Sequence, residues 1–181
     1  MIAFRHADPR MPFLREEAGD SGARWHDAGD EGPVNYLSDT PDGAWAEFLR
    51  HEEIRDAQEL ATIRRALWAV DIGDEATAVP ALPEATLTGG RESYAACRQE
   101  ARRLRATGAT RFDAPSAALL PGGACGHRVD AGLRAGPARQ GRTIVLFGCR
   151  PLLIGWRAAY EGRPADELLT RVRHLRDHPT A

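Results

Sequence analysis

Short stretches in which apolar and polar positions alternate, or in which β-branched and aromatic residues gather, predict β-strands along the chain. The expected strands are residues 2–5, 33–38, 67–70, 110–113, 143–147 and 152–156. The composition of 143–147, Thr-Ile-Val-Leu-Phe, is typical of a buried strand. By pattern alone, residues 61–71 fit a helix or a strand, and their β-branched and aromatic part, 67–70, favours the strand.

Helical periodicity predicts three helices. Residues 91–107 place Tyr94, Cys97, Ala101 and Leu104 on one stripe, and Gly108 ends the pattern. A second helix begins near Pro41, with Thr40 or Asp39 as the N-cap, and runs through Arg50. Glu47 therefore lies on a helix. Residues 164–175 form an amphipathic terminal helix, with Leu168, Val172 and Leu175 on one stripe.

Three segments lack such patterns. Residues 9–32 indicate a long irregular loop, 73–90 a Pro- and Thr-rich connector, and 121–141 a mobile excursion rich in Gly, Ala, Pro and Arg. Short strands mixed with few helices and long loops favour an α+β fold over regular βαβ repeats. A length of 181 residues predicts a single domain spanning 1–181.

The charge balance argues against a protein that binds nucleic acid. The chain has 24 basic and 26 acidic residues, a formal net charge of −2, and every basic residue is arginine. Compositional bias toward Arg, Ala, Gly and Pro is the simplest cause of the missing lysines. The N-terminus lacks a secretory signal pattern and no apolar run has transmembrane length, so we expect a cytoplasmic protein without membrane contact.

Cysteine spacing and short motifs exclude several common chemistries. Cys97, Cys125 and Cys149 fit neither a disulfide framework nor a paired zinc site, and we expect no metal. The sequence contains no dinucleotide-binding G-x-G-x-x-G before a helix, no P-loop, no G-x-S-x-G and no H-E-x-x-H.

Several polar residues lie beside the predicted strand ends, and each has an ordinary structural explanation when taken alone. They are Arg5, Arg24 with Trp25, Tyr36, Glu47 and Ser116, the last in a turn expected to be exposed. An edge charge, a stacked pair that pins a loop, a core tyrosine, a solvated helix face and a turn former would account for them.

The order and context of these residues, however, resemble the RES domain, a family named for its arginine, glutamate and serine. The similarity runs through Phe4-Arg5, the segment 21–25 ending in Arg24-Trp25, the strand 33–38, and the helix 40–47 that carries the glutamate. It continues through 108–116, which ends in the serine, and through 146–148 and 153–156. Residues 52–90 have no assigned counterpart. The chain departs from the family pattern at Ser21 and Ala23, which replace glycines, and at His26-Asp27, which replace Asn-Pro.

The resemblance implies a fold similar to ADP-ribosyltransferases and an enzyme that cleaves the nicotinamide–ribose bond of NAD+. NAD+ would be a substrate, water or inorganic phosphate the acceptor, and no cofactor would be needed. The resemblance also implies a toxin whose partner is an antitoxin, usually an Xre-type helix-turn-helix protein. Oligomeric state stays open, with a homo-oligomer one option.

Physical chemistry gives each matched residue a role in that reaction. Glu47 would stabilise the oxocarbenium-like state, and Arg5 and Arg24 would grip the pyrophosphate or an attacking phosphate. Tyr36, beside Trp25, would stack on nicotinamide or position it by its hydroxyl, and Ser116 would hydrogen-bond near Glu47 or the ribose. Two alternatives remain: transfer of ADP-ribose to a protein, and a non-catalytic arginine-rich binding module.

Overall fold

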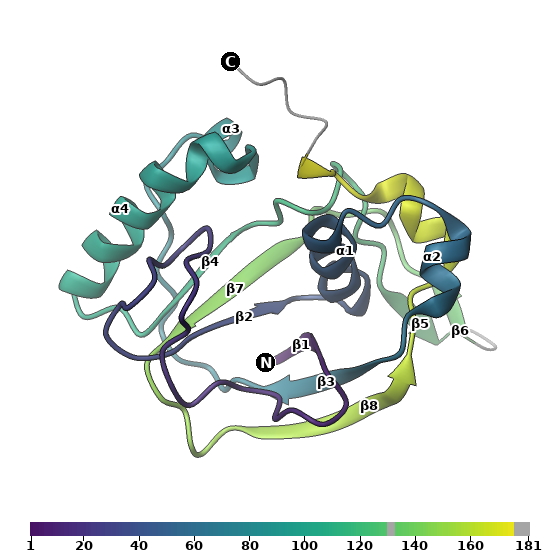
Figure 1. Cartoon of the computed structure of the whole chain (residues 1–181), viewed down its shortest axis with the longest axis horizontal. Helices are drawn as coiled ribbons and strands as arrows, with labels where there is room; N and C mark the ends of the chain where they lie inside the picture. The colour runs from purple at the N-terminus through teal and green to yellow at the C-terminus, as the bar shows by residue number, and fades with distance from the viewer. Residues whose placement is uncertain (130–132, 176–181) are drawn as a thin grey trace.

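Six strands form a central antiparallel sheet in the order β4-β7-β2-β1-β3-β8 (Figure 1). The computed structural model describes residues 1–129 and 133–175. The sheet strands are β1 (Ile2–Ala7), β2 (Val34–Ser38), β3 (Arg65–Asp71), β4 (Arg111–Pro115), β7 (Arg142–Phe147) and β8 (Ile154–Gly162). A separate hairpin pairs β5 (His127–Val129) with β6 (Leu133–Ala135). The α+β class predicted from the sequence is confirmed.

The pairing between neighbouring strands is shortest at the centre of the sheet. β1 pairs with β3 from Ile2↔Asp71 to Ala7↔Ala66, and β2 pairs with β7 from Val34↔Phe147 to Ser38↔Thr143. β1 and β2, in contrast, share a single register pair, Phe4↔Ser38. The two halves of the sheet therefore separate beyond that pair.

The helix α1 (Pro41–Glu52) lies against the centre of the sheet (Figure 1). Thr40 caps it: its Oγ1 accepts a hydrogen bond from Gly43 N at 3.0 Å, and Pro41 occupies the first turn, as the sequence predicts. A Cβ at Gly43 would lie 2.9 Å from the Cβ of Ser38, so only glycine allows this approach to β2. The contact fixes where the next turn of α1 meets the sheet.

Three hydrophobic clusters hold the layers together. One joins α1 to the short helix α2 (Ala57–Thr62) and to the 3₁₀ turn η2 (Asp166–Arg171). A second packs α4 (Tyr94–Ala106) on β4 and β7 through residues such as Leu104, Phe112 and Val145. The third covers the other face of the sheet with residues such as Leu14, Val70 and Ile144. Both faces of β7 are therefore covered, as its apolar composition predicts.

Most predicted elements are confirmed, including the loop over 9–32. The helix predicted over 91–107 is present as α4, which follows the 3₁₀ turn η1 (Arg91–Ser93), ends at Ala106 and is followed by Gly108 with a φ of 82°. The segment 61–71, which fits a helix or a strand by pattern alone, divides between the end of α2 and β3. The last predicted strand begins two residues later than expected and extends to Gly162.

Two segments that were expected to be irregular contain regular structure that the sequence did not predict. The expected connector 73–90 contains a helix, α3 (Glu84–Thr88), after Pro83. The expected mobile excursion 121–141 contains the β5–β6 hairpin, while 130–132 lie outside the described residues.

The predicted terminal helix is instead η2 followed by an extended segment. Leu120 N donates to Arg171 O at 2.9 Å and Arg173 N to Ala118 O at 2.7 Å, so pairing with residues 118–120 takes up backbone groups that a helix would use. Across residues 1–129 and 133–175, the helices are too short or too polar to cross a bilayer.

Candidate active site

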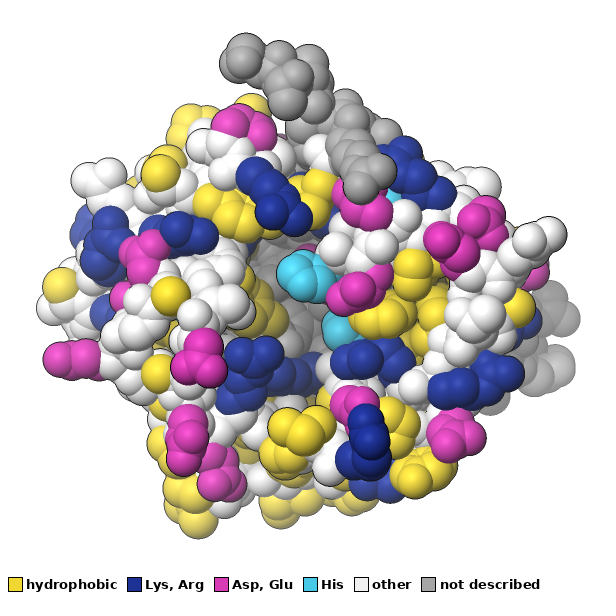
Figure 2. All heavy atoms as spheres, viewed as in Figure 1, with side chains coloured by type: hydrophobic (Ala, Val, Ile, Leu, Met, Phe, Trp, Pro, Cys, Tyr) yellow, Lys and Arg dark blue, Asp and Glu magenta, His cyan; other side chains and the backbone are white. Residues whose placement is uncertain are grey.

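A cavity of about 720 Å³ lies where β1 and β2 separate. Its walls come mainly from β1, the loop 8–25, β2, α1 and the first residue of α4, with one residue each from β3, β4 and β7. Figure 2 shows the hollow on this face, with histidine and arginine side chains around it. The histidines that line the cavity are His6 and His51. Ligand sites commonly occupy about 300–1,000 Å³, so the cavity can hold a ligand of dinucleotide size.

Five arginines line this cavity: Arg5, Arg15, Arg24, Arg50 and Arg65. Within the described residues, none of the five forms an ion pair with a carboxylate. The acidic residues of the lining are Asp8, Glu16, Glu17 and Glu47. Uncompensated arginine forks in a cavity are suited to an anionic ligand such as a phosphate.

Glu47 projects from the second turn of α1 into the cavity. Its Oε1 accepts a hydrogen bond of 3.0 Å from Thr143 Oγ1 on β7. Among the described residues, no donor contacts Oε2. One carboxylate oxygen is thus held by the protein, and the other can meet a ligand.

Arg5 spans the gap between the two halves of the sheet. Its Nη1 donates to Oδ1 of Asn35 on β2. The buried Asn35 also accepts from Arg15 N at 2.7 Å and donates from Nδ2 to Arg15 O at 3.1 Å, so it ties β1, β2 and the loop together. Burial, and secondarily the nearby Arg15, lower the pKa of Arg5 to about 10, and its guanidinium keeps its charge at neutral pH.

His6 lies on β1 next to this group and is neutral. Its pKa is lowered to about 3, mainly by burial and additionally by the positive charges of Arg65 and Arg5. Its Nδ1 accepts a hydrogen bond of 3.1 Å from Arg65 Nε, and its ring packs 5.0 Å from that of Phe48. A neutral imidazole can stand among arginines where a charged one could not.

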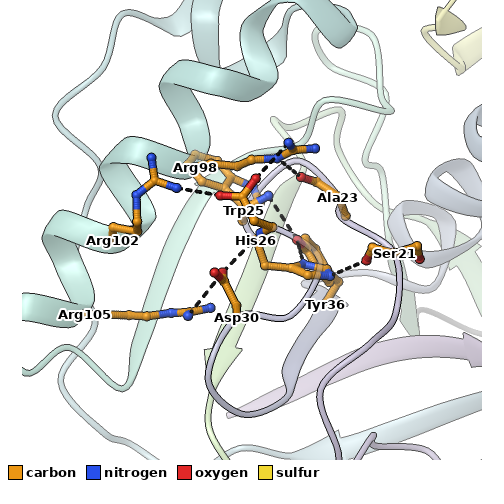
Figure 3. A network of polar contacts seen from close by, with 10 residues as sticks. Ser21, Ala23, Trp25, His26, Asp30, Tyr36, Arg98, Arg102 and Arg105 are labelled. Atoms are coloured by element: carbon orange, nitrogen blue, oxygen red, sulfur yellow. Dashed lines mark hydrogen bonds and ion pairs between the residues drawn. The ribbon is translucent and has the colours of Figure 1, made fainter.

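Tyr36 faces the cavity with a hydroxyl that is already engaged (Figure 3). The hydroxyl accepts from Trp25 N at 3.0 Å and lies 2.8 Å from His26 Nδ1. Nε2 of His26 lies 3.1 Å from the Ser21 carbonyl, which can only accept, so Nε2 carries the proton and Nδ1 accepts from Tyr36. Burial raises the pKa of Tyr36, so the phenol stays protonated. Its ring, rather than its hydroxyl, is what a ligand would meet.

Trp25 lies in the core beneath this wall. It is 2% exposed and packs edge-on against Phe112, with ring centroids 4.8 Å apart. It lines the cavity with little of its surface and holds Tyr36 through its backbone N–H.

Arg24 and Arg50 approach each other at the α4 side of the cavity. Arg24 Nη2 and Arg50 Nη2 both donate to Gly89 O, at 2.6 and 2.8 Å. The guanidinium of Arg24 lies 4.8 Å from the Tyr94 ring centroid and also donates to Ser93 Oγ at 3.0 Å. Arg24 thus stacks on Tyr94, not on its neighbour Trp25.

Ser116 is buried, which corrects the expectation of an exposed turn serine. Its Oγ accepts from the N–H groups of Ala118 and Leu119, both at 3.2 Å. Its neighbours Pro115 and Ala117 line the cavity, but Ser116 does not. Its hydroxyl shapes the turn that brings those neighbours to the wall.

The structure therefore gathers Arg5, Arg24, Trp25, Tyr36 and Glu47 around one cavity and places Ser116 behind it. Sequence reasoning missed Arg50, Arg15, Arg65, His6 and Asn35. Arg50 could have been found, because it lies three residues after Glu47 on the same predicted helix, where side chains share a face. The described residues contain no group of three or more His, Cys, Asp or Glu arranged to hold a metal ion.

Comparison with known proteins agrees with the family suggested by the ordered residues. A structure similar to this one is a chain of the crystal structure of the M. tuberculosis MbcT–MbcA toxin–antitoxin complex. The TM-score is 0.57 at 15% sequence identity, over 93% of this chain and 86% of that chain, and the likeness shows a shared fold. No curated protein matches the sequence. The family model of the RES domain matches residues 2–129, and the chain belongs to the RES domain family.

Proposed function

We propose that this protein is a toxin-type enzyme that consumes NAD+ by cleaving its nicotinamide–ribose bond. The observation that carries the proposal is the setting of Glu47: a carboxylate fixed at one oxygen by Thr143, in a cavity whose arginines have no carboxylate partner among the described residues. The chain also belongs to the RES domain family, and its resemblance to that family implies this reaction, which supports the proposal further.

Glu47 would act on the charge that develops in the sugar. The bond between ribose C1″ and the pyridinium nitrogen breaks, and nicotinamide leaves with the electron pair as a neutral molecule. The ribose then carries positive charge like an oxocarbenium ion, which a nearby carboxylate stabilises. An oxygen of water or phosphate forms the new bond to C1″, and a water acceptor loses its proton to solvent.

The other residues would bind and orient the dinucleotide. Arg5 and Arg24 offer forks to the phosphates, and Tyr36 offers its ring to nicotinamide, because its hydroxyl already serves Trp25 and His26. Trp25 would act indirectly, by holding Tyr36 through its backbone N–H. Ser116 would also act indirectly, by shaping the 115–117 turn at the cavity wall.

The test is release of nicotinamide from NAD+ by the purified protein, with and without inorganic phosphate. Glu47→Gln keeps the size of the side chain and removes its charge, so release should fall by a factor of about 100–1,000. Glu52→Gln is the matched control, because Glu52 lies on the same helix, is exposed and does not line the cavity. Equal rates for wild type and Glu47→Gln would contradict the role of Glu47.

Product analysis separates the acceptors. ADP-ribose indicates water, ADP-ribose 1″-phosphate indicates phosphate, and ADP-ribose attached to protein, detected by mass spectrometry, indicates a transferase instead.

An antitoxin partner is part of the proposal. The similar solved structure is described as a toxin–antitoxin complex, and a partner that covers the cavity would protect the cell that makes the enzyme. Expression of this chain alone should arrest growth, and coexpression with the product of a neighbouring gene should restore it. Normal growth of cells that express the wild-type chain alone would count against the toxin.

A further inference from the structure

The meeting of Arg24 and Arg50 at Gly89 is not explained by packing alone. Both side chains are more than nine-tenths buried, at 8% and 3% exposure, and both line the cavity. Their remaining partners carry no carboxylate: Arg24 donates to Ser93 Oγ, Thr86 O and Cys97 Sγ, and Arg50 donates to the carbonyls of Ala117 and Arg173. Two positive charges therefore share one carbonyl oxygen.

Like charges brought this close repel each other, and burial adds a desolvation cost. Burial lowers the pKa of Arg50, the charge of Glu47 acts in the opposite direction, and that of Arg24 adds to the lowering. Arg173, which donates to Thr88 O at 3.3 Å, brings a third positive charge near the same carbonyls. An anion at this point would remove the repulsion.

Each of the two guanidiniums keeps donors for such an anion. A guanidinium has five N–H donors. Within the described residues, the Nε of Arg24 and the Nε of Arg50 have no acceptor, and each Nη2 uses one N–H on Gly89. Nε and Nη2 form one edge of the fork, the edge that binds phosphate or carboxylate side-on.

This pair lies next to the proposed reacting centre. Glu47 and Arg50 are three residues apart on α1, so their side chains emerge from the same face of the helix. Arg24 reaches the same place from the loop, beside Tyr94. Among the described residues, neither the cavity lined by Phe48, Ile54 and Arg64 nor the exposed apolar side chains show a comparable convergence of buried charge.

We propose that Arg24 and Arg50 form a phosphoryl-binding subsite at the α4 side of the cavity, adjacent to Glu47. The inference rests on the proposed function and deepens it, because it assigns Arg50 to binding and places the bound anion beside the sugar. The phosphoryl group can come from the pyrophosphate of NAD+ or from free inorganic phosphate.

The experiment titrates the purified protein with inorganic phosphate, pyrophosphate or ADP-ribose. Calorimetry measures the affinity for each anion, and the rise in Tm measures how far each anion stabilises the protein. The variants are Arg50→Gln and Arg24→Gln. Arg64→Gln is the matched control, because Arg64 is exposed, donates only to the nearby carbonyls of Ala61 and Ile63, and does not line the cavity. Wild type and the control should bind alike, and each of the other variants should bind about tenfold more weakly or worse.

The anions tell the two sources apart. If the variants lose affinity for inorganic phosphate and keep their affinity for ADP-ribose, the subsite binds free phosphate. If they lose affinity for pyrophosphate and ADP-ribose, the subsite binds the substrate's own phosphates. Failure of wild type to bind any of the three at 10 mM, taken as roughly the weakest affinity of interest, or equal binding by wild type and both variants, overturns the proposal.

A structural role for Arg50 gives a different result. It would lower Tm without anion in Arg50→Gln and leave the anion-induced rise in Tm intact. If Arg50→Gln does not fold, Arg50→Lys takes its place: it keeps the charge but not the fork, and it should also weaken binding. These titrations contain no NAD+, so they can succeed even if nicotinamide release fails, and the two proposals are judged separately.

Discussion

Arginines of α4 and arginines in the cavity have opposite surroundings. On α4, Arg98 and Arg102 pair with Asp27 at 2.9 and 2.5 Å, and Arg103 pairs with Glu100 at 2.7 Å. In the cavity, Arg5, Arg24 and Arg50 donate to an amide, a hydroxyl and backbone carbonyls, with no carboxylate partner among the described residues. One residue type thus serves two purposes.

The difference distinguishes charges that the protein neutralises itself from charges that it leaves for a ligand. Exposed ion pairs contribute about 0–1 kcal/mol each and are easily replaced. A buried guanidinium without a counterion is unfavourable in the empty site and becomes favourable when an anion binds. In a chain whose 24 basic residues are all arginine, the partner of each one is therefore more informative than its identity.

Among variants that compare the two groups of arginines, the largest effect should follow from removing an arginine charge in the cavity. Arg5→Met should lower kcat/KM for NAD+ about 100-fold, because a charge-assisted hydrogen bond to the substrate contributes roughly 2–3 kcal/mol. Folding should persist, since Asn35 keeps its hydrogen bonds to Arg15. Arg102→Met, the surface control, should leave kcat/KM unchanged in the same assay. A similar loss in both variants would erase the contrast between the two groups.

The burial of His6, together with the positive charge of Arg65 and Arg5 around it, should also appear in the pH dependence of stability. His6 has a pKa of about 3 in the folded chain and an ordinary value of 6.5 when unfolded. Between those values the unfolded chain binds a proton that the folded chain does not, so stability falls as pH drops below about 6.5, by up to about 1.4 kcal/mol per pH unit.

Urea unfolding between pH 7 and pH 4 measures that slope. His6→Gln should flatten it, and His51→Gln, at an exposed position of the same cavity, should not. An unchanged slope in His6→Gln would mean that His6 takes up a proton in the folded state.

A smaller effect is expected at Thr143. Thr143→Val removes the hydrogen bond to Glu47 Oε1 and keeps the shape of the side chain, so the carboxylate should be less well placed. We expect kcat to fall about fivefold to tenfold, equivalent to roughly 1 kcal/mol. Nicotinamide release measures it, and Thr143→Ser should restore most of the rate. Failure of serine to restore the rate would point to packing rather than to the hydrogen bond.

The smallest effect should come from the surface pairs. Asp27→Asn breaks the ion pairs with Arg98 and Arg102, and the free energy of unfolding should fall by less than about 1 kcal/mol. Tm should therefore fall by less than about 4 °C. Because loop 21–26 is also held by His26 and Arg24, kcat/KM should change less than about twofold. Loss of activity here would show that the paired arginines position the site as well.

Local signals account for the parts of the fold that sequence reasoning predicted. Thr40 and Pro41 start α1, periodicity and Gly108 define α4, and an apolar run forms β7. Each of these signals acts within a few residues of chain. The helix predicted over 164–175 was wrong for the opposite reason. Val172 pairs with Leu119, far away in the sequence, and that pairing overrides the helical pattern.

The residues of the candidate site also divide into those that the sequence predicted and those that only the structure shows. Arg5, Arg24, Tyr36 and Glu47 were predicted from an ordered resemblance, and all four line the cavity. Ser116 was predicted with them but acts behind the wall, since only the folded chain shows that its hydroxyl is used by Ala118 and Leu119. Asn35 and His6 carried no sequence signal, because their importance comes from neighbours on other strands and loops.

By itself, the sequence determined the α+β class, the main helices and strands, and the family to which the chain belongs. These follow from local propensity, from periodicity and from the order of a few residues. Only the tertiary structure decided which arginines remain without a carboxylate, that Tyr36 presents its ring, and that Arg50 joins Arg24 beside Glu47. The physical reason is that charge pairing and burial depend on distances between residues that are far apart in the chain, and folding alone sets those distances.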